Sequence, residues 1–190
     1  HVGSTAIAAG EKIANRGFMV GPDGADIVTY DKIHMFDVDL DNGESWRESA
    51  TYQPGVRSVV AEMPFASIGM AVCYDLRFPV WLRNVDEEYD MLLIVANWPE
   101  RRSLHWRTLI PARAIENQAF VVAVNRVGHD GNEIYHSGDS MCIDPNGKVI
   151  YYKPNDEDLY TFSISKEDLS TARELFPFLR DADKFNLNNK

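Results

Sequence analysis

Two unbroken apolar runs in the middle of the chain constrain its fold more than any other feature. Residues 91–96 read MLLIVA and residues 120–125 read FVVAVN. Short runs without polar alternation are typical of strands buried on both faces, as in parallel sheets covered by helices. Between them, Ser103 can cap a helix that buries Trp106, and Pro111 is expected to kink or restart that helix. This order of strand, helix and strand predicts an α/β fold.

Shorter apolar runs on either side predict antiparallel hairpins. Residues 15–20 and 27–30 flank the turn GPDG, and residues 140–144 and 148–152 flank the turn PNG. Proline and glycine supply the backbone angles that such turns need. The other strands that we expect are residues 56–62, 67–73 and 159–164. Parallel and antiparallel strands together predict a mixed sheet.

The domain organisation is simple. The 190 residues contain no repeat, linker or low-complexity segment, so we expect one domain over residues 1–190. Residues 37–54 form a polar connection of the kind that often lines a site, and residues 78–85 suggest a short helix. The sequence SKED at 165–168 is a capping box that opens a final helix, which Pro177 ends. A C-terminal arm is therefore expected from about residue 165.

Charge and composition exclude several classes of partner. The chain carries 29 acidic and 19 basic residues, a net charge of −10, which disfavours nucleic acid and anionic membrane surfaces. No apolar stretch is long enough to cross a membrane. The two cysteines, Cys73 and Cys142, are too few for a disulfide framework and favour a reducing compartment. We therefore expect a soluble, cytoplasmic protein.

Cys73 is the sharpest local feature. In GMAVCYD (residues 69–75), a buried strand delivers a cysteine to the point where the chain turns into a helix. That geometry exposes the sulfur, places backbone N–H groups nearby and is expected to favour the thiolate, as acyl transfer requires. The alternative is an inert, buried cysteine that packs as a small hydrophobe.

Two charged residues earlier in the chain are further candidates. Lys32 follows a strand directly, where an ammonium can hold an oxyanion and stabilise a thiolate. Glu48 lies in the polar connection. Taken singly, each also fits an ordinary surface residue, because most lysines and glutamates are solvated.

Four sequence blocks, taken together, resemble the nitrilase superfamily of carbon–nitrogen hydrolases. YDKIHMFD at 30–37 resembles its lysine signature and CYDLRFP at 73–79 its cysteine signature. ARAIENQ at 112–118 and GDS at 138–140 are similar to two further blocks, in the same order. The resemblance implies a nitrilase-like α-β-β-α sandwich with mixed sheets, and it runs from near residue 15 to the tail.

The resemblance also implies a catalytic set. By position, Cys73 matches the nucleophile, Lys32 the catalytic lysine and Glu48, in WRES, the supporting second glutamate; the backbone N–H of Tyr74 joins Lys32 around the oxyanion. The general-base glutamate of the family belongs to an N-terminal segment that matches nothing before Lys32, where Glu11 does not fit. We therefore expect an N-terminal βα portion to be missing from this chain.

Three blocks, CYDLRFPVW at 73–81, ANWP at 96–99 and SLHW at 103–106, resemble one branch of the superfamily, the omega-amidases. This likeness implies a small amide substrate of the 2-oxoglutaramate or 2-oxosuccinamate type, hydrolysed to acid and ammonia through a Cys73 thioester. Such a substrate carries a carboxylate, and Arg77 is placed to bind it. Trp98 is expected to form part of the pocket wall. An ion pair of Arg77 with Asp75 or Glu100 is the alternative. A carbamoylase or an aliphatic amidase of the same family is the nearest competing activity.

Other classes of function also remain open. A catalytically silent family subunit would explain the missing glutamate. A metal hydrolase would need its histidines together, but His34, His105, His129 and His136 show no i, i+4 pair. A redox pair of Cys73 and Cys142 lacks the usual close spacing. The resemblance implies no cofactor and no metal, and it implies a homodimer or larger homo-oligomer.

Overall fold

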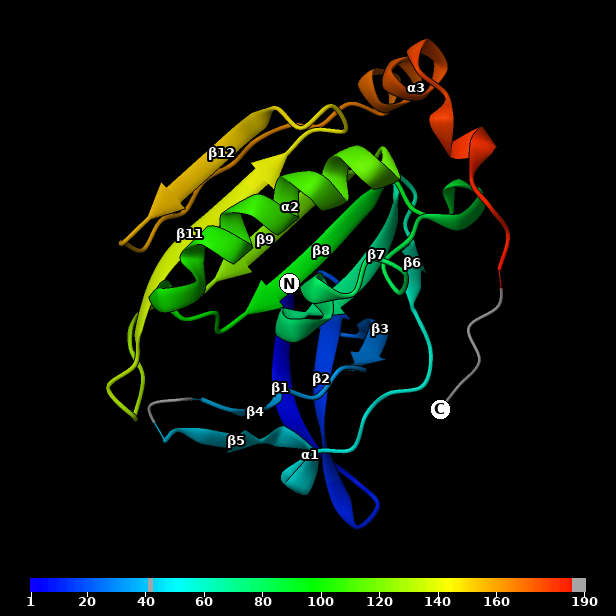
Figure 1. The fold of residues 1–190 in the computed structure, drawn as a ribbon. Helices are drawn as coiled ribbons and strands as arrows, with labels where there is room; N and C mark the ends of the chain where they lie inside the picture. The colour runs from blue at the N-terminus through cyan, green and yellow to red at the C-terminus, as the bar shows by residue number, and fades with distance from the viewer. Residues whose placement is uncertain (41–42, 186–190) are drawn as a thin grey trace.

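A mixed seven-stranded sheet forms the centre of the molecule (Figure 1). The computed structural model describes residues 1–40 and 43–185. Three parallel strands lie side by side in it: β7 (Ser67–Val72), β8 (Met91–Ala96) and β9 (Phe120–Asn125). Their carboxyl ends meet at one edge, because Val72 pairs with Val95 and Ala96 with Asn125. The predicted parallel strands are confirmed, but burial on both faces is not: residues alternate between buried and half-buried along β8, and Val124 of β9 is exposed.

Antiparallel strands extend the sheet on both sides. The strand order is β10-β11-β9-β8-β7-β6, with β12 also paired to β11. The added strands are β6 (Val60–Glu62), β10 (Val127–His129), β11 (Tyr135–Ile143) and β12 (Val149–Pro154). The β11–β12 hairpin forms where the sequence predicts it, and the mixed α/β class is confirmed.

A second, three-stranded sheet contains the N-terminal part of the chain. Its antiparallel strands are β1 (Val2–Ala9), β2 (Lys12–Val20) and β3 (Asp26–Asp31). The β2–β3 hairpin was expected, whereas β1 was not. β1 reads VGSTAIAA and most of it is exposed, so it lacks the alternating pattern that marks a half-buried strand.

Helix α2 (Ser103–Asn117) covers one face of the central sheet. Trp106, Ile110 and Ala114 are fully buried on it and pack against alternate residues of β8 and β9. The helix runs through Pro111 without restarting and ends at Gln118 in the left-handed conformation. The capping residue is Arg102, so the prediction that Ser103 caps the helix is wrong.

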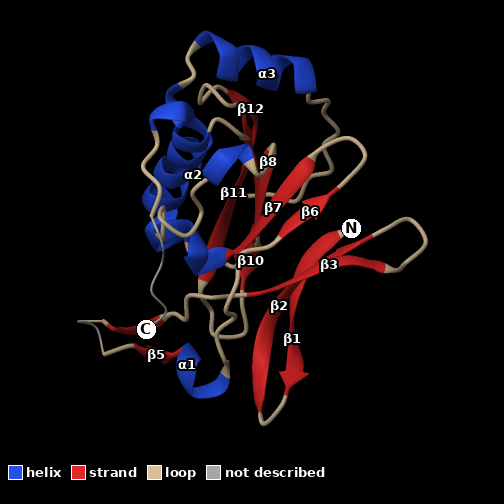
Figure 2. Ribbon diagram, turned by 90° about the vertical axis from the view of Figure 1, so that its right-hand side faces the viewer, coloured by secondary structure: helices blue, strands red, loops and turns tan. Residues whose placement is uncertain are grey.

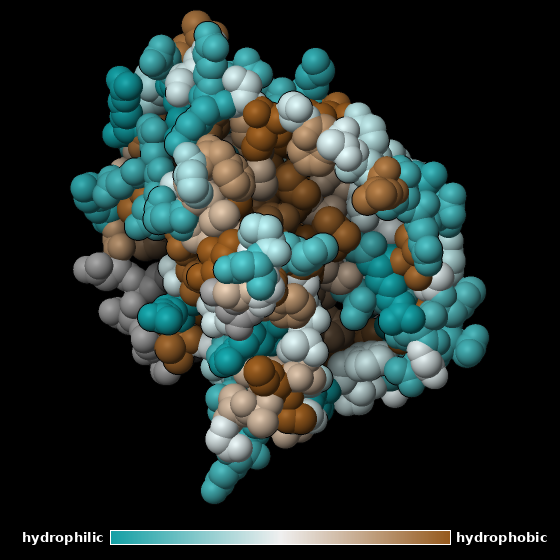
Figure 3. Space-filling model, turned by 180° about the vertical axis from the view of Figure 1, so that it is seen from behind, coloured by the Kyte–Doolittle hydropathy of each residue, from teal (hydrophilic) through white to brown (hydrophobic). Residues whose placement is uncertain are grey.

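The two faces of the sheet have different neighbours. Figure 2 shows α2 on one side and the β1–β3 sheet on the other. On this second side Met19 and Tyr30 pack against Ile68, Met70 and Val72 of β7. Apolar side chains also gather in a hollow on the back of the molecule (Figure 3). The hairpin sheet thus packs on the part of the central sheet that ends at Cys73.

The polar connection between β3 and the central sheet contains little regular secondary structure. It contains β4 (Asp37–Asp39), β5 (Ser45–Arg47) and the single-turn helix α1 (Glu48–Thr51). Asp41 and Asn42, which belong to this predicted connection, lie outside the described residues. Glu48 is thus the first residue of a helical turn rather than part of an irregular loop.

Three further elements differ from the prediction. The strand expected at 56–62 forms only over Val60–Glu62. Residues 78–84 form turns and irregular backbone instead of a helix, between the 3-10 segments η1 (Cys73–Arg77) and η2 (Val85–Glu87). Residues 159–164 form no strand, although the alternation in LYTFSI is strand-like. Tyr160 in this segment stacks on Tyr151 of β12, so aromatic packing replaces strand pairing.

The tail returns to the body of the same chain. Ser165 caps helix α3 (Lys166–Leu175), and its hydroxyl accepts the N–H groups of Glu167 and Asp168, which is the serine half of the predicted capping box. Arg173 on α3 donates to the carbonyl oxygens of Tyr89, at 2.8 Å, and Gln118, at 3.1 Å. The other 3-10 segments are η3 (Glu100–Arg102) and η4 (Phe178–Asp181). Among the described helices, none has the length and apolar character needed to cross a membrane.

Candidate active site

A cavity of about 260 Å³ opens at the carboxyl edge of the parallel strands. This edge is where open α/β sheets commonly bind ligands. All six residues that the sequence predicted for the site line this cavity: Lys32, Glu48, Cys73, Tyr74, Arg77 and Trp98. They come from four separate segments of the chain, so their convergence is a property of the fold. Their individual roles stay predictions.

Cys73 lies at a sharp turn between a strand and a helical segment. β7 ends at Val72, η1 begins at Cys73, and the Cys73 backbone has a φ of +48°. A positive φ is unusual for a residue with a side chain and is common where strain serves a site. The half-buried sulfur reaches the cavity, and its thiol donates to the carbonyl oxygen of Asn97 at 3.9 Å.

The expectation that the helix start lowers the Cys73 pKa is wrong. Burial raises the pKa of the Cys73 thiol above its ordinary value; the charge of Lys32 and the hydrogen bond to Asn97 offset only part of this. The helical segment that begins at Cys73 spans only five residues, too short for a strong dipole. The raised pKa favours the neutral thiol over the thiolate.

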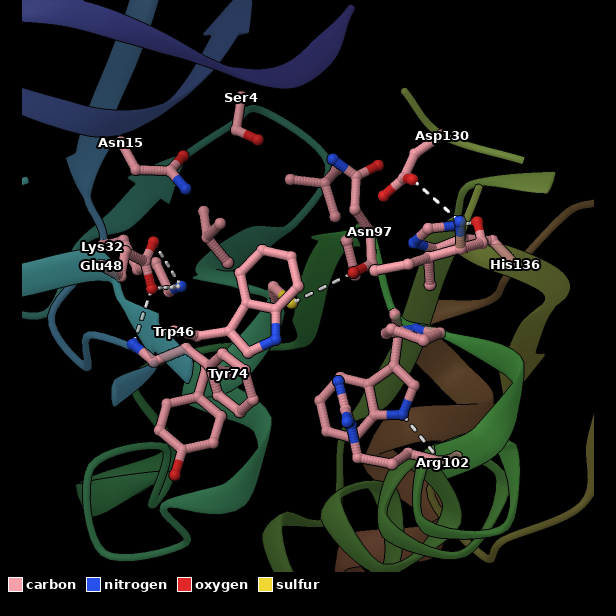
Figure 4. A pocket seen from close by; sticks show the side chains of 18 of the residues that line it. Ser4, Asn15, Lys32, Trp46, Glu48, Tyr74, Asn97, Arg102, Asp130 and His136 are labelled. Carbon is pink, nitrogen blue, oxygen red and sulfur yellow. Dashed lines mark hydrogen bonds and ion pairs between the residues drawn. The ribbon is translucent and has the colours of Figure 1, made fainter. Parts of the chain in front are cut away.

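Lys32 and Glu48 form a buried ion pair in the cavity wall. The Lys32 Nζ lies 2.6 Å and 2.8 Å from the two oxygens of the Glu48 carboxylate, and the backbone N–H of Phe36 donates to the same carboxylate at 2.6 Å. In Figure 4 both side chains lie together at one end of the cavity. The pair holds the ammonium in one place, where it adds positive charge next to Cys73.

The backbone around Lys32 is held on both sides. Its N–H donates to the Asn15 carbonyl at 2.9 Å, and its carbonyl accepts the N–H of Gly55 at 2.8 Å. A Cβ at residue 55 would lie 2.1 Å from the Asp31 carbonyl oxygen, so only glycine fits there. The segment after β3 therefore presents Lys32 from a fixed backbone.

Arg77 lies across the cavity and forms neither of the ion pairs weighed in the sequence analysis. Its guanidinium stacks on the Trp98 ring, with 4.5 Å from Cζ to the centroid, and both terminal nitrogens lie 3.2 Å from Nδ1 of His105. This contact requires an unprotonated Nδ1 on His105. Burial lowers the Arg77 pKa, although a guanidinium stays charged at neutral pH. Arg77 therefore contributes a positive charge to the cavity lining.

The structure adds residues that the sequence analysis missed. Arg102 lines the cavity with its guanidinium 5.2 Å from the Phe36 ring, and burial is the main cause of its lowered pKa. Within the described part of the chain, neither Arg77 nor Arg102 forms an ion pair. Asn97 could have been found, because it directly follows a buried parallel strand. Arg102 carries no such signal.

The residues considered for a metal or redox site lie apart. In residues 1–40 and 43–185, no three His, Cys, Asp or Glu side chains form a group that could hold a metal ion. His34 pairs with Asp75, and His129 stacks against Tyr135 instead. Both cysteines are free, and Cys142 is fully buried within β11. The described donor set therefore offers no cluster for a metal.

A family profile and two curated relatives match most of this chain. The sequence profile of the carbon–nitrogen hydrolase family matches residues 2–174. The chain is 43% identical to the omega-amidase YafV of Escherichia coli over 186 residues, 97% of this chain and 69% of YafV. It is 35% identical to the 2-oxoglutaramate amidase of Paenarthrobacter nicotinovorans over 95% of this chain and 62% of that protein.

A solved structure has the same fold at high similarity. XC1258 from Xanthomonas campestris, a CN-hydrolase superfamily protein with an arsenic adduct in its active site, superposes with a TM-score of 0.90. The identity is 39%, covering 98% of this chain and 70% of XC1258. The nitrilase-like fold expected from the sequence blocks is confirmed. This chain belongs to the carbon–nitrogen hydrolase family, in its omega-amidase branch.

Proposed function

We propose that the protein hydrolyses the terminal amide of a small dicarboxylic acid monoamide through a thioester on Cys73. One observation carries this proposal: a cysteine on a strained strand-to-helix turn shares a cavity with a buried Lys32–Glu48 ion pair and two arginines free of acidic partners in the described chain. A nucleophile, a fixed cation and an anion-binding wall are the parts that this reaction needs.

The first half of the reaction forms the acyl-enzyme. The Cys73 sulfur attacks the amide carbon while its proton passes to a base, and the carbonyl electrons move to oxygen. Lys32 and the backbone N–H of Tyr74 stabilise that oxyanion; one such donor is worth about 3 kcal/mol. The tetrahedral intermediate then collapses, the carbon–nitrogen bond breaks and ammonia leaves with the proton returned by the base.

The base is a separate carboxylate. Glu48 is engaged by Lys32 and by the N–H of Phe36, and Asp130, which also lines the cavity, accepts the N–H groups of Asn132 and Ile134. We assign this role to the glutamate that the family resemblance places outside the motifs present here. In the second half, the same base activates water, which hydrolyses the thioester to the acid and restores the thiol.

The cavity fits an amide that also carries a carboxylate. Arg77 and Arg102 bring two guanidinium groups to the cavity wall. In Figure 4, Arg102 lies on the other side of the cavity from Lys32 and Glu48. A guanidinium binds a carboxylate in a planar, two-pronged manner, and low local polarity strengthens the contact. The names of the two curated relatives point the same way. We therefore assign the substrate to the class of 2-oxoglutaramate and 2-oxosuccinamate.

The test is ammonia release by the full-length native protein from 2-oxoglutaramate and from a simple aliphatic amide, with Cys73→Ala as the control. Release that depends on Cys73 and favours the keto-acid amide supports the proposal. Release from neither substrate, with Cys73 still readily alkylated, leaves a family hydrolase with another substrate. An inert thiol and no turnover would favour the catalytically silent subunit.

A further inference from the structure

Asp75 is a fully buried carboxylate two residues after the proposed nucleophile. It lies on the η1 segment that begins with Cys73, and its side chain is fully enclosed. A buried carboxylate is costly unless every oxygen is hydrogen-bonded. Four hydrogen bonds reach it within the described residues: from the backbone of Val72 and His34, the ring of His34 and the hydroxyl of Tyr30.

The two backbone contacts join the two segments that supply the proposed catalytic groups. One oxygen, Oδ2, accepts the N–H of Val72, the residue before Cys73, at 3.1 Å. The other, Oδ1, accepts the N–H of His34, two residues after Lys32, at 3.1 Å. One rigid carboxylate thus bridges the nucleophile turn and the segment that carries the lysine.

Two side chains hold this bridge in place. The Tyr30 hydroxyl donates to Oδ2 at 2.7 Å, and the His34 ring lies with Nδ1 2.8 Å from Oδ1. That ring stacks on Phe78 at 3.6 Å between centroids, nearly parallel, and meets Trp81 edge-on. The carboxylate is therefore fixed by aromatic packing on the Lys32 side as well as by its own turn.

We propose that Asp75 is a positioning residue that sets the separation of Cys73 and Lys32, and so the geometry of the oxyanion site. This inference rests on the proposed function, because it takes Cys73 as nucleophile and Lys32 as oxyanion donor. A carboxylate suits this place for a chemical reason: both of its oxygens accept, and each receives a backbone N–H that cannot be turned into an acceptor.

Asp75→Asn tests this directly. In either orientation the amide NH₂ faces one of the two backbone N–H groups, so one bridge contact is lost while size and shape are kept. Misplacement of the oxyanion donor by about 1 Å acts on the transition state, and we expect kcat to fall roughly 10²-fold with KM nearly unchanged. Alkylation of Cys73 by iodoacetamide should also slow, because Lys32 no longer lowers the thiol pKa as strongly.

Asp139→Asn is the matched control. Asp139 is also buried, but its carboxylate accepts hydrogen bonds from the hydroxyls of Ser103, Ser137 and Tyr152. A hydroxyl can rotate and accept a hydrogen bond from the new amide NH₂. Asp139→Asn therefore replaces a carboxylate by an amide, as Asp75→Asn does, but brings no two donors face to face. Its kcat and its Cys73 alkylation rate should stay within about threefold of the native values, on the scale of a single adjusted hydrogen bond.

Each outcome decides the inference. A folded Asp75→Asn protein with native kcat and alkylation rate would overturn it, and so would an equal loss in Asp139→Asn. If Asp75→Asn does not fold, the decision passes to His34→Phe, which keeps the stacked ring and removes Nδ1. A several-fold loss of kcat at constant KM would then support the inference, and native kinetics would overturn it.

The readouts separate this inference from the proposed function. The alkylation rate depends on Cys73 and its neighbours and not on the choice of amide. A wrong substrate would leave turnover at zero in every variant, while the alkylation rates would still differ between Asp75→Asn and Asp139→Asn. An unreactive native Cys73 would instead defeat the proposed function itself.

Discussion

Cys142 lies within a strand of the central sheet and Cys73 directly follows another, yet the two differ in most properties that matter for chemistry. Cys142 is fully buried within β11, and burial together with Asp144 raises its pKa to about 12. Burial raises the pKa of Cys73 too, but this residue turns out of β7 with a positive φ into a cavity beside Lys32. The comparison teaches that an apolar strand alone produces an inert thiol. The turn and the fixed cation distinguish a candidate nucleophile.

The largest expected effect is the loss of the nucleophile. Cys73→Ala should lower kcat at least about 10⁴-fold, since no other group in a covalent mechanism replaces the attacking atom. Cys142→Ala, the matched change at the other thiol, should leave kcat within about twofold because it touches no reacting group. Ammonia release at saturating substrate measures both. Equal losses in the two variants would break the distinction between the thiols.

The next effect concerns the cation beside Cys73. Lys32→Met should lower kcat by about 10²- to 10³-fold through loss of an oxyanion donor. It should also slow alkylation of Cys73, whose pKa rises further without the positive charge. Lys153→Met, which removes a lysine from an exposed pair with Asp156, serves as the control. Native alkylation rates in Lys32→Met would show that the cation does not act on the thiol.

A smaller effect should separate substrate binding from thiol reactivity. Arg77→Lys keeps the charge but loses the planar group stacked on Trp98, so KM for a carboxylated amide should rise about tenfold. The KM for an uncharged amide and the alkylation rate of Cys73 should not change. Steady-state kinetics with both amides provide the measurement. A uniform rise in both KM values would mean that Arg77 shapes the cavity rather than binding the carboxylate.

The smallest effect is on stability at high pH. The pKa of Cys142 is raised from 9.0 to about 12, so the folded state holds the thiol proton more tightly than the unfolded state. The contribution of the Cys142 thiol to the free energy of unfolding is complete below pH 9 and declines as the pH rises toward 12. At pH 10 this loss should be of the order of 1 kcal/mol and absent from Cys142→Ala. Urea unfolding of both proteins at pH 7 and pH 10 checks it, with a parallel pH response counting against it.

The sequence predicted the elements whose pattern is long and self-consistent. β8, β9 and the helix between them follow from uninterrupted apolar runs and a helical stripe. The strand predicted at residues 159–164 is wrong, because Tyr160 in this segment stacks on Tyr151 and the segment pairs with no strand. β1 was not predicted, because its small and mostly exposed residues show almost no hydrophobic periodicity.

Only those residues of the candidate site that lie in recognisable sequence motifs could be predicted. Cys73, Lys32 and Glu48 were assigned by likeness to family motifs, and the fold brings them to one cavity. The raised pKa of Cys73 was not predictable, because it depends on the burial created by distant segments. Arg102 was missed for the same reason, since its position in the cavity wall is set by tertiary packing.

The backbone at residue 73 also limits which amino acids could take the place of the proposed nucleophile. A φ of +48° is tolerated by unbranched side chains at some strain but is a severe outlier for β-branched ones. Serine is therefore an accessible replacement in the course of evolution, whereas threonine is excluded by the backbone before its hydroxyl is ever tested as a nucleophile. The turn that exposes the sulfur thus narrows the chemistry open to descendants of this chain.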